Sequence, residues 1–227
     1  MGRGARGVGI ELLDEPGITG PELGASLEHV ADATTRLGGL GPLARALARV
    51  PTSDGTLRLL DVGAGNGRVA AMLARILERR GRSVRWVCSD LAPGALDHVL
   101  CPRTPRVACD ARTLPFADDS FDAAVSVLTL HHFDPGDARA VLAEMARVAR
   151  GPVVVSDLRR SVGGSWGARL LAETVWRRNR FTRHDAPLSA SKAYTDGEAG
   201  VLAREAGLSR VRVRRHFPFR FVLVAQP

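Results

Sequence analysis

The stretch LLDVGAGNGRVA, residues 59–70, decides the fold of this chain. An apolar run ends at Asp61, a helical pattern begins at Val69, and three glycines alternate between them: Gly63, Gly65 and Gly67. Glycine tolerates a positive φ and lets a ligand approach the bare backbone. The first turn of a helix adds unpaired N–H groups and the positive end of a dipole. The stretch therefore predicts a buried strand, a tight turn and a helix start that together bind a nucleotide-like ligand.

Outward from this stretch, apolar runs of strand length alternate with helical patterns. Strands are predicted at residues 59–62, 84–89, 106–109, 123–128 and 152–156, and helices between them at 69–80, 93–100 and 137–149. Such alternation predicts an α/β fold, a mostly parallel sheet with helices on both faces. Its ligands are expected beyond the C-terminal ends of the strands.

The end of the chain breaks this alternation. A helix is predicted at 198–206, followed by two strands at 211–213 and 219–224 with only a short join between them. Strands joined so closely must pair antiparallel. The sequence therefore predicts a parallel sheet with an antiparallel hairpin at one edge.

The first 52 residues contain no strand pattern. Helical spacing at 21–36 and 42–50, followed by turn residues at 51–55, predicts an N-terminal helical cap over residues 1–52, packed on a main domain of residues 53–227. No apolar run is long enough to span a bilayer, and the N-terminus lacks the apolar core of a signal peptide. A cytoplasmic location is therefore expected.

Charge and cysteine content argue against several classes of function. The net charge is +8, but the basic residues, all arginine except Lys192, are scattered along the chain, so no specific nucleic-acid partner is expected. The three cysteines show no CxxC spacing, which argues against a disulfide framework or a metal site. Residues 166–181 are amphipathic and are interpreted as a helix on the sheet rather than as a membrane contact.

Two carboxylates follow neighbouring strands. Asp90 closes the second strand, where a carboxylate can accept hydrogen bonds from both ribose hydroxyls; the alternative is a helix N-cap before Pro93. Asp110 follows the third strand, where it can accept from the exocyclic amine of adenine, and the N–H of Ala111 is available to a ring nitrogen. The GxGxG spacing differs from the GxGxxG of nicotinamide oxidoreductases.

Together these motifs resemble the class I S-adenosylmethionine-dependent methyltransferases, in particular the small-molecule enzymes of quinone and polyketide tailoring. The resemblance covers about residues 58–157 and consists of DVGAGNG, Asp90, DARTLPFADDSFD and LTLHHF in the family's order and spacing. It implies a Rossmann-like, seven-stranded sheet with an antiparallel last strand and S-adenosyl-L-methionine as cofactor. It also implies methyl transfer to an oxygen or a carbon of a phenolic, quinone or polyketide-like small molecule.

The resemblance assigns cofactor-binding roles to individual residues. Asp61 and the three glycines would surround the methionine part, Asp90 would take the ribose, and Asp110 the adenine. The full set is Asp61, Gly63, Gly65, Gly67, Asp90, Leu91, Asp110, Ala111 and Val127. Arg68 departs from the family, in which many relatives carry an acid or a small residue at the start of this helix.

Three histidines are candidates for a general base, although alignment of the nucleophile supplies most of the catalysis in this reaction. His131 and His132 follow the fourth strand, at the edge where the transferred methyl is expected, and His184 lies in a predicted loop, RHDAPLS. Imidazole titrates near neutrality and can take a proton from a phenol or enol. The structural alternative is that these side chains cap the strand end or bond to the backbone.

Two residues are candidates for binding the acceptor. Arg159 follows the fifth strand and can hold a carboxylate or phenolate by a charge-assisted bond, the alternative being an ion pair between Asp157 and an arginine. Tyr194, the only tyrosine, can line the pocket.

Other functions stay open at this point. An RNA or protein methyltransferase would suit the positive charge, but LTLHHF stands where amino-group methylators of nucleic acids often carry an N/D-P-P-F/Y run. A cofactor-binding module without catalysis and a nicotinamide oxidoreductase are further alternatives. Neither the acceptor nor the oligomeric state follows from the sequence.

Overall fold

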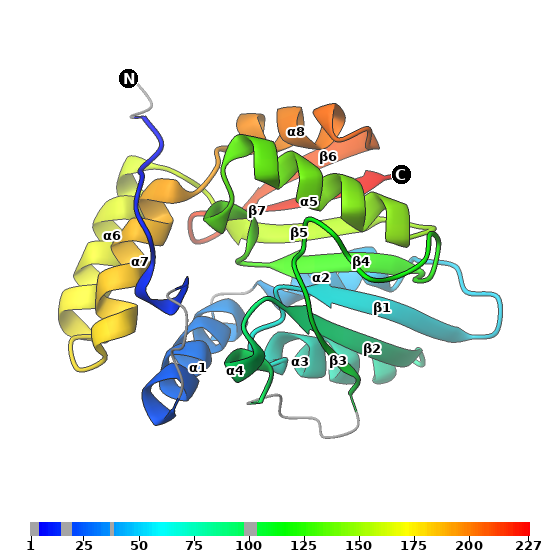
Figure 1. Ribbon diagram of the computed structural model, residues 1–227, viewed down its shortest axis with the longest axis horizontal. Helices are drawn as coiled ribbons and strands as arrows, with labels where there is room; N and C mark the ends of the chain where they lie inside the picture. Colours follow the sequence, from blue (N-terminus) through cyan, green and yellow to red (C-terminus); the bar gives the residue numbers. More distant parts are fainter. Residues whose placement is uncertain (1–4, 15–19, 37–38, 98–103) are drawn as a thin grey trace.

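A seven-stranded sheet forms the centre of the protein, with strand order β3-β2-β1-β4-β5-β7-β6 (Figure 1). The computed structural model describes residues 5–14, 20–36, 39–97 and 104–227. The strands are β1 (Thr56–Val62), β2 (Ser83–Asp90), β3 (Arg106–Ala108), β4 (Ala123–Val127), β5 (Val153–Leu158), β6 (Ser209–His216) and β7 (Arg220–Gln226). Strands β1 to β5 pair in parallel, and β7 lies antiparallel between β5 and β6. The predicted fold class, including the reversed last strand, is confirmed.

Helices cover both faces of the sheet because its central strands are apolar on both sides. Every residue of β4 is buried. On one face the apolar core is formed with α5 (Pro135–Val148) and α8 (Asp196–Glu205), and on the other with α2 (Leu40–Leu47) and α3 (Arg68–Glu78). The part of the predicted cap that forms α2 therefore shares the core of the main domain. The division at residue 52 stays a prediction.

Three helices lie beyond the C-terminal ends of the strands: α1 (Pro21–Arg36), α6 (Val162–Thr174) and α7 (Arg180–Lys192). Figure 1 shows them together at the left of the view. The short α4 (Pro93–Leu96) follows β2; residues 98–100 of the predicted helix lie outside the described residues. No helix in the described ranges is long and apolar enough to cross a membrane.

The prediction of one amphipathic helix at 166–181 was wrong. The chain leaves α6 at Thr174 and starts α7 at Arg180, because the side chain of Asn179 accepts a hydrogen bond from the Thr182 N–H and caps a new helix. Helix α6 packs against α7 rather than on the sheet. The predicted loop RHDAPLS, which contains Pro187, is also part of α7.

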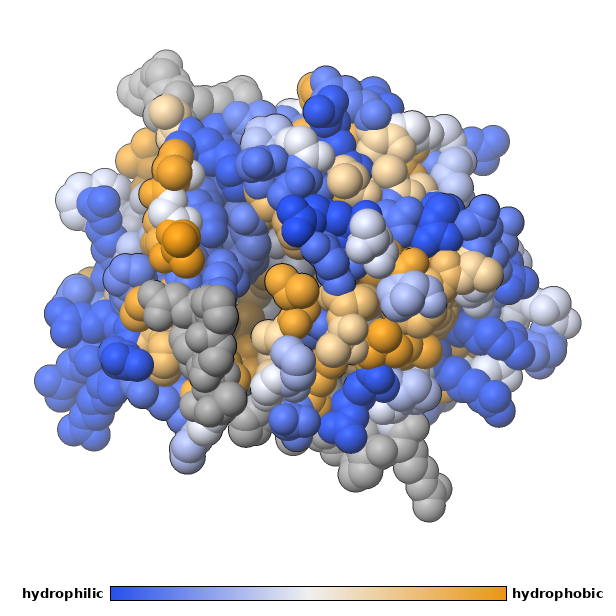
Figure 2. Space-filling view, viewed as in Figure 1, coloured by the Kyte–Doolittle hydropathy of each residue, from blue (hydrophilic) through white to orange (hydrophobic). Residues whose placement is uncertain are grey.

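An extended segment, residues 5–14, runs along α7 and is called the N-terminal strap below. Its last residues form a short 3₁₀ turn, η1 (Leu12–Asp14). The backbone N–H groups of Leu12 and Leu13 donate to the two carboxylate oxygens of Asp185 in α7, at 2.8 and 3.0 Å. The strap places Val8 and Ile10 in solvent, and Figure 2 shows apolar surface along it.

Candidate functional site

A cavity of about 1020 Å³ opens at the C-terminal ends of β1, β2, β4 and β5. The strap, α1, α6 and α7 close it from the other side. All but one of the predicted cofactor-binding residues line it: Asp61, Gly63, Gly65, Asp90, Leu91, Asp110, Ala111 and Val127. The exception is Gly67, which lies outside the lining and caps α3 with a φ of 65°. Residues separated by many tens of positions therefore form one site.

The glycine turn leaves bare backbone beside the cavity. Gly63 has a φ of 73°, and a Cβ added there would lie 2.3 Å from the side chain of Thr129, so only glycine fits. The N–H of Gly65 donates to Asp90 Oδ2 at 2.8 Å, and that of Ala92 donates to Asp90 Oδ1 at 3.0 Å. Asp90 thus connects the end of β2 to the turn after β1. Helix α4 has no side-chain cap, so the alternative role of Asp90 as its N-cap is wrong.

Asp61 is a buried acid at the end of β1. Its Oδ1 has no hydrogen-bond partner among the described residues. Burial, and secondarily the negative charge of Asp90, raises the pKa of Asp61 to about 7. A buried carboxyl group with a raised pKa and a free acceptor oxygen is suited to a ligand that brings a positive charge or hydrogen-bond donors.

Asp61→Asn is expected to stabilise the ligand-free fold at pH 8 by about 2–4 kcal/mol and to leave it nearly unchanged at pH 4. The folded-state pKa of Asp61 is about 7, against an ordinary value of 3.8. The folded protein therefore holds a proton that the unfolded chain releases, and stability is lost as the pH rises from about 4 to 7. Denaturant unfolding of both proteins at the two pH values measures the difference; equal stabilities at pH 8 would contradict it.

Asp110 has a partner inside the protein. Its carboxylate accepts hydrogen bonds from the Arg112 guanidinium, at 2.6 Å for the shortest, and Arg112 also pairs with Asp137 at 2.7 Å. The hydrogen bonds from Arg112 lower the pKa of Asp110. Because a carboxylate has about four acceptor sites, it keeps capacity for a further donor from the cavity.

His131 forms a buried pair with Asp157. The ring Nδ1 lies 2.6 Å from Asp157 Oδ1, and the backbone N–H of His131 donates to Oδ2 at 3.0 Å. Since an ionised carboxylate can only accept, Nδ1 carries a hydrogen, and in the neutral form of the ring Nε2 is then the acceptor. His131 lines the cavity. The arrangement can take up a proton at Nε2 and stabilise the resulting imidazolium.

His132 stacks beside His131, with ring centroids 4.4 Å apart. Its Nδ1 lies 2.8 Å from Asp14 Oδ2 in the strap. Burial acts to lower the pKa of His132, but the hydrogen bond to Asp14 and the charge of Glu11 outweigh it, and the pKa is raised. His132 therefore attracts the strap to the end of β4.

Sequence reasoning missed Glu11, the acid at the centre of this cluster. The side chain of Glu11 is 2% exposed and accepts a hydrogen bond from Ser189 Oγ at 2.7 Å. Its Oε1 lies 3.1 Å from Lys192 Nζ and 3.9 Å from His131 Nε2. Although burial opposes ionisation, these basic groups lower the pKa of Glu11 to about 2. A lone buried lysine was the available signal, because such an ammonium needs an acidic partner.

Ligand atoms of Glu11, His131 and His132 lie within 4.8 Å of one another, a spacing that a metal ion can use. The ammonium of Lys192 already supplies positive charge at Glu11. The expectation of no metal stays a prediction.

Glu11→Gln is expected to weaken attachment of the strap by about 2–3 kcal/mol at pH 7. The folded-state pKa of about 2 lies below the ordinary 4.5, so the stabilisation is complete above pH 4.5 and is lost as the pH falls toward 2. Hydrogen exchange of the Leu12 and Leu13 amides, which donate to Asp185, should accelerate about 30-fold or more. Glu78→Gln, at the exposed end of α3, is the control. Unchanged exchange in the Glu11 variant would refute this role.

Of the remaining candidates for acceptor binding and proton transfer, one lines the cavity and two do not. Arg159 lines the cavity and has no ion pair with Asp157, which bonds to His131 instead. Tyr194 lies outside the lining, because its ring is buried in the core and its hydroxyl donates to the Phe133 carbonyl at 2.8 Å. His184 also lies outside the lining: it is half exposed on α7, with Nδ1 2.8 Å from Asp185.

Arg68, the departure from the family pattern, fixes α1 against the glycine turn. Its guanidinium pairs with Glu28 and, at 2.7 Å, with Asp32, both in α1. The adjacent Asn66 donates to Glu28 at 3.0 Å. Gly67, the N-cap residue of α3, has no side chain that could accept a hydrogen bond from the first turn of the helix. The arginine therefore joins the start of α3 to the helix that covers the cavity.

Comparisons with known proteins point to one class of enzyme. The family model described as a methyltransferase domain matches residues 60–152. A demethylmenaquinone methyltransferase of Mycolicibacterium paratuberculosis is 38% identical over 103 residues, which is 44% of this chain and 41% of that protein. The methyltransferase GfsG of Streptomyces halstedii is 33% identical over 142 residues, 59% of this chain and 47% of that protein. The matches thus span less than half the length of these relatives.

A solved structure agrees over nearly the whole chain. An S-adenosylmethionine-dependent methyltransferase of Aquifex aeolicus superposes with a TM-score of 0.64 at 17% identity, covering 89% of this chain and 97% of that one. At this identity the likeness establishes the fold.

Proposed function

Because the chain belongs to the class I S-adenosylmethionine-dependent methyltransferases, we propose that it transfers a methyl group to an oxygen or a carbon of a small-molecule acceptor. One observation carries the proposal. The cavity is lined both by a carboxylate that connects β2 to the glycine turn and by His131, which pairs with the buried Asp157. The first suits a nucleoside, and the second suits removal of a proton from an acceptor.

The cavity residues fit the cofactor, S-adenosylmethionine. Asp61 Oδ1, which has no partner in the part of the chain that the structure describes, and the bare backbone at Gly63 suit its amino-acid tail. Asp90 suits the ribose and Asp110 the adenine. Leu91, Ala111 and Val127 supply cavity wall, and Gly67 starts the helix below the turn. When bound, the cofactor supplies an electrophilic methyl group on a sulfonium.

The chain's own residues have three tasks in this reaction. The cavity wall orients the acceptor and excludes water, which is most of the catalysis required. His131 accepts a proton from the acceptor at Nε2, and Asp157 holds the ring in the required tautomer. His132 holds the strap across the cavity through Glu11 and Asp14, so that the acceptor reacts in an enclosed site.

A phenolic, quinone or polyketide-like acceptor is proposed. The demethylmenaquinone methyltransferase that is 38% identical over 103 residues supports this class of acceptor. A phenol or an enol has a proton that an imidazole can remove, and the cavity of about 1020 Å³ is large enough for a bicyclic ring beside a nucleoside.

The test has a binding arm and a reaction arm. Calorimetry with S-adenosylhomocysteine and S-adenosylmethionine should give saturable binding, and NAD should give none. A panel of bicyclic phenols is then incubated with the methyl donor, and release of S-adenosylhomocysteine is followed. Absence of binding by either donor analogue would reject the proposal.

A further inference from the structure

Two arginines that line the cavity differ from several other arginines of the described residues in forming no ion pair with a carboxylate. Ion pairs connect the guanidinium groups of Arg68, Arg112, Arg147, Arg160, Arg183 and Arg215 to acids. Arg159 and Arg220 also line the cavity, but neither has an ion pair with an acid in the described ranges. Their charges are therefore available to a ligand.

Arg220, the first residue of β7, is 3% exposed. Its Nη1 makes a long hydrogen bond of 3.4 Å to Thr34 in α1. Asp157 is close enough to act on Arg220 electrostatically. Asp157 accepts hydrogen bonds from His131 and from the N–H of Leu158, and none joins it to Arg220 among the described residues. Within the described ranges this guanidinium makes no other hydrogen bond, so most of its donors are left for a ligand.

Arg159 follows the residue that pairs with Arg220 across the sheet. Leu158 of β5 pairs with Arg220 of β7, and the N–H of Arg159 donates to the carbonyl of Phe219 at 2.7 Å. The Nε of Arg159 is buried and has no hydrogen-bond partner within the described part of the chain. Two planar donor groups thus come from adjacent positions at the same end of the sheet.

We propose that Arg159 and Arg220 bind a carboxylate of the methyl acceptor, so that the acceptor is a hydroxylated organic acid. A buried guanidinium without an anion is costly, and its fork of donors matches a carboxylate in two parallel bonds. The inference rests on the proposed function, because it specifies the substrate of that same cavity.

The strand order places this anion site on the acceptor side of the cavity. In the order β2-β1-β4-β5-β7, the glycine turn and Asp90 follow β1 and β2, whereas the arginines lie on β5 and β7. His131 follows β4, between the two groups. An acid bound at the arginines therefore has the proposed base between itself and the nucleoside.

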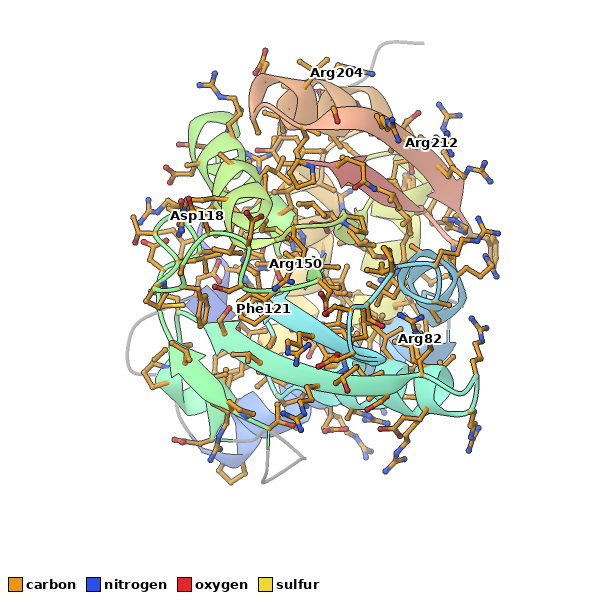
Figure 3. All side chains as sticks on the ribbon, turned by 90° about the vertical axis from the view of Figure 1, so that its right-hand side faces the viewer. Arg82, Asp118, Phe121, Arg150, Arg204 and Arg212 are labelled. Carbon is orange, nitrogen blue, oxygen red and sulfur yellow. The ribbon has the colours of Figure 1, made fainter. Side chains whose placement is uncertain are left out.

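The experiment uses matched pairs of probes that differ only in the carboxylate: 1-hydroxy-2-naphthoate against 1-naphthol, and 4-hydroxybenzoate against phenol. Their affinities are measured by calorimetry with and without S-adenosylhomocysteine. The proteins are wild type, Arg220→Gln, Arg220→Lys, Arg159→Gln and the control Arg212→Gln. Arg212 is an exposed residue of the edge strand β6, labelled in Figure 3.

Wild type and Arg212→Gln should bind at least one acid about tenfold or more tightly than its neutral partner. Arg220→Gln and Arg159→Gln should each lose most of that preference, and Arg220→Lys should keep part of it. Arg159→Gln removes a partly exposed side chain, so it tests the site even if the Arg220 variants fold poorly.

Equal affinities for acid and neutral probes in wild type would overturn the proposal. So would a preference that persists in both glutamine variants. If Arg220→Gln instead weakened only S-adenosylhomocysteine, the arginine would serve the carboxylate of the donor, and the proposal would again be wrong. Failure of wild type to bind S-adenosylhomocysteine would reject the proposed function, while the measurements without it still test the anion site.

Discussion

Asp90→Asn should weaken the affinity for S-adenosylhomocysteine by about 100-fold or more. In the proposed binding mode, two charge-assisted hydrogen bonds to the ribose hydroxyls are weakened or lost, each contributing about 1.5–3 kcal/mol. An amide also presents an N–H to one of the two backbone N–H groups, of Gly65 and Ala92, that the carboxylate accepts. The glycine turn is then held less firmly, so the backbone proposed to contact the cofactor is also less well positioned.

Loss of the fold would not account for this result. Burial raises the pKa of Asp90, so removing its charge relieves a cost in the ligand-free protein. We expect thermal unfolding to change little. Asp97→Asn, an exposed acid after α4, is the matched control and should bind S-adenosylhomocysteine as wild type does. An affinity of Asp90→Asn within threefold of wild type would show that this carboxylate does not hold the ribose.

His131→Gln should lower kcat by about 100- to 10,000-fold, the usual contribution of a positioned general base. The affinity for S-adenosylhomocysteine should stay the same, because the histidine follows β4 and the nucleoside residues follow β1 and β2. Asp157→Asn should lower kcat as well, since the amide no longer fixes the hydrogen on Nδ1.

A structural role for His131 predicts a different pattern. If the histidine removes a proton, acceptors with more acidic hydroxyl groups, such as nitro-substituted phenols, should regain most of the lost rate in the variant. If it only supports the end of β4, the loss should be the same for all acceptors. His216→Gln, on β6, controls for the loss of an imidazole elsewhere. A uniform loss across the acceptor series would rule out the base.

The sheet was predictable because each of its strands carries a local signal. Apolar runs bounded by turn residues gave β1, β2, β4 and β5 within a few residues of their ends. The short join around His216 already required antiparallel pairing of the last two strands. The boundary between α6 and α7 was missed because helical spacing continues across it, and the N-cap at Asn179 looks like any other polar residue.

The site residues that could be predicted are likewise those with a local signal in the sequence. Asp90 and the glycines stand in a recognisable strand–turn–helix context, so their juxtaposition was foreseen. Contacts between distant elements were not foreseen, inside the site or outside it. Outside the site, Asp118, labelled in Figure 3, accepts a hydrogen bond from Arg147 of α5 at 2.7 Å, which no spacing in the sequence indicates.

The contact between the strap and α7 is the clearest example of one that local sequence patterns cannot predict. An extended segment has no periodicity to detect, and its hydrogen bond from Leu12 reaches Asp185, 173 residues further along the chain. Arg220 was missed for a related reason. A charged residue that begins a strand normally faces solvent, whereas Arg220 is buried and its guanidinium reaches Thr34 of the distant helix α1.

The chemical reactivity of a single lysine can be used to measure how often the cavity opens. Lys192 is the only side-chain amine, and it lies buried against Glu11 of the strap. An acylating reagent can modify that amine only while the strap is displaced. The rate at which Lys192 is acylated, followed by mass spectrometry, would therefore measure how often the strap opens and exposes the cavity.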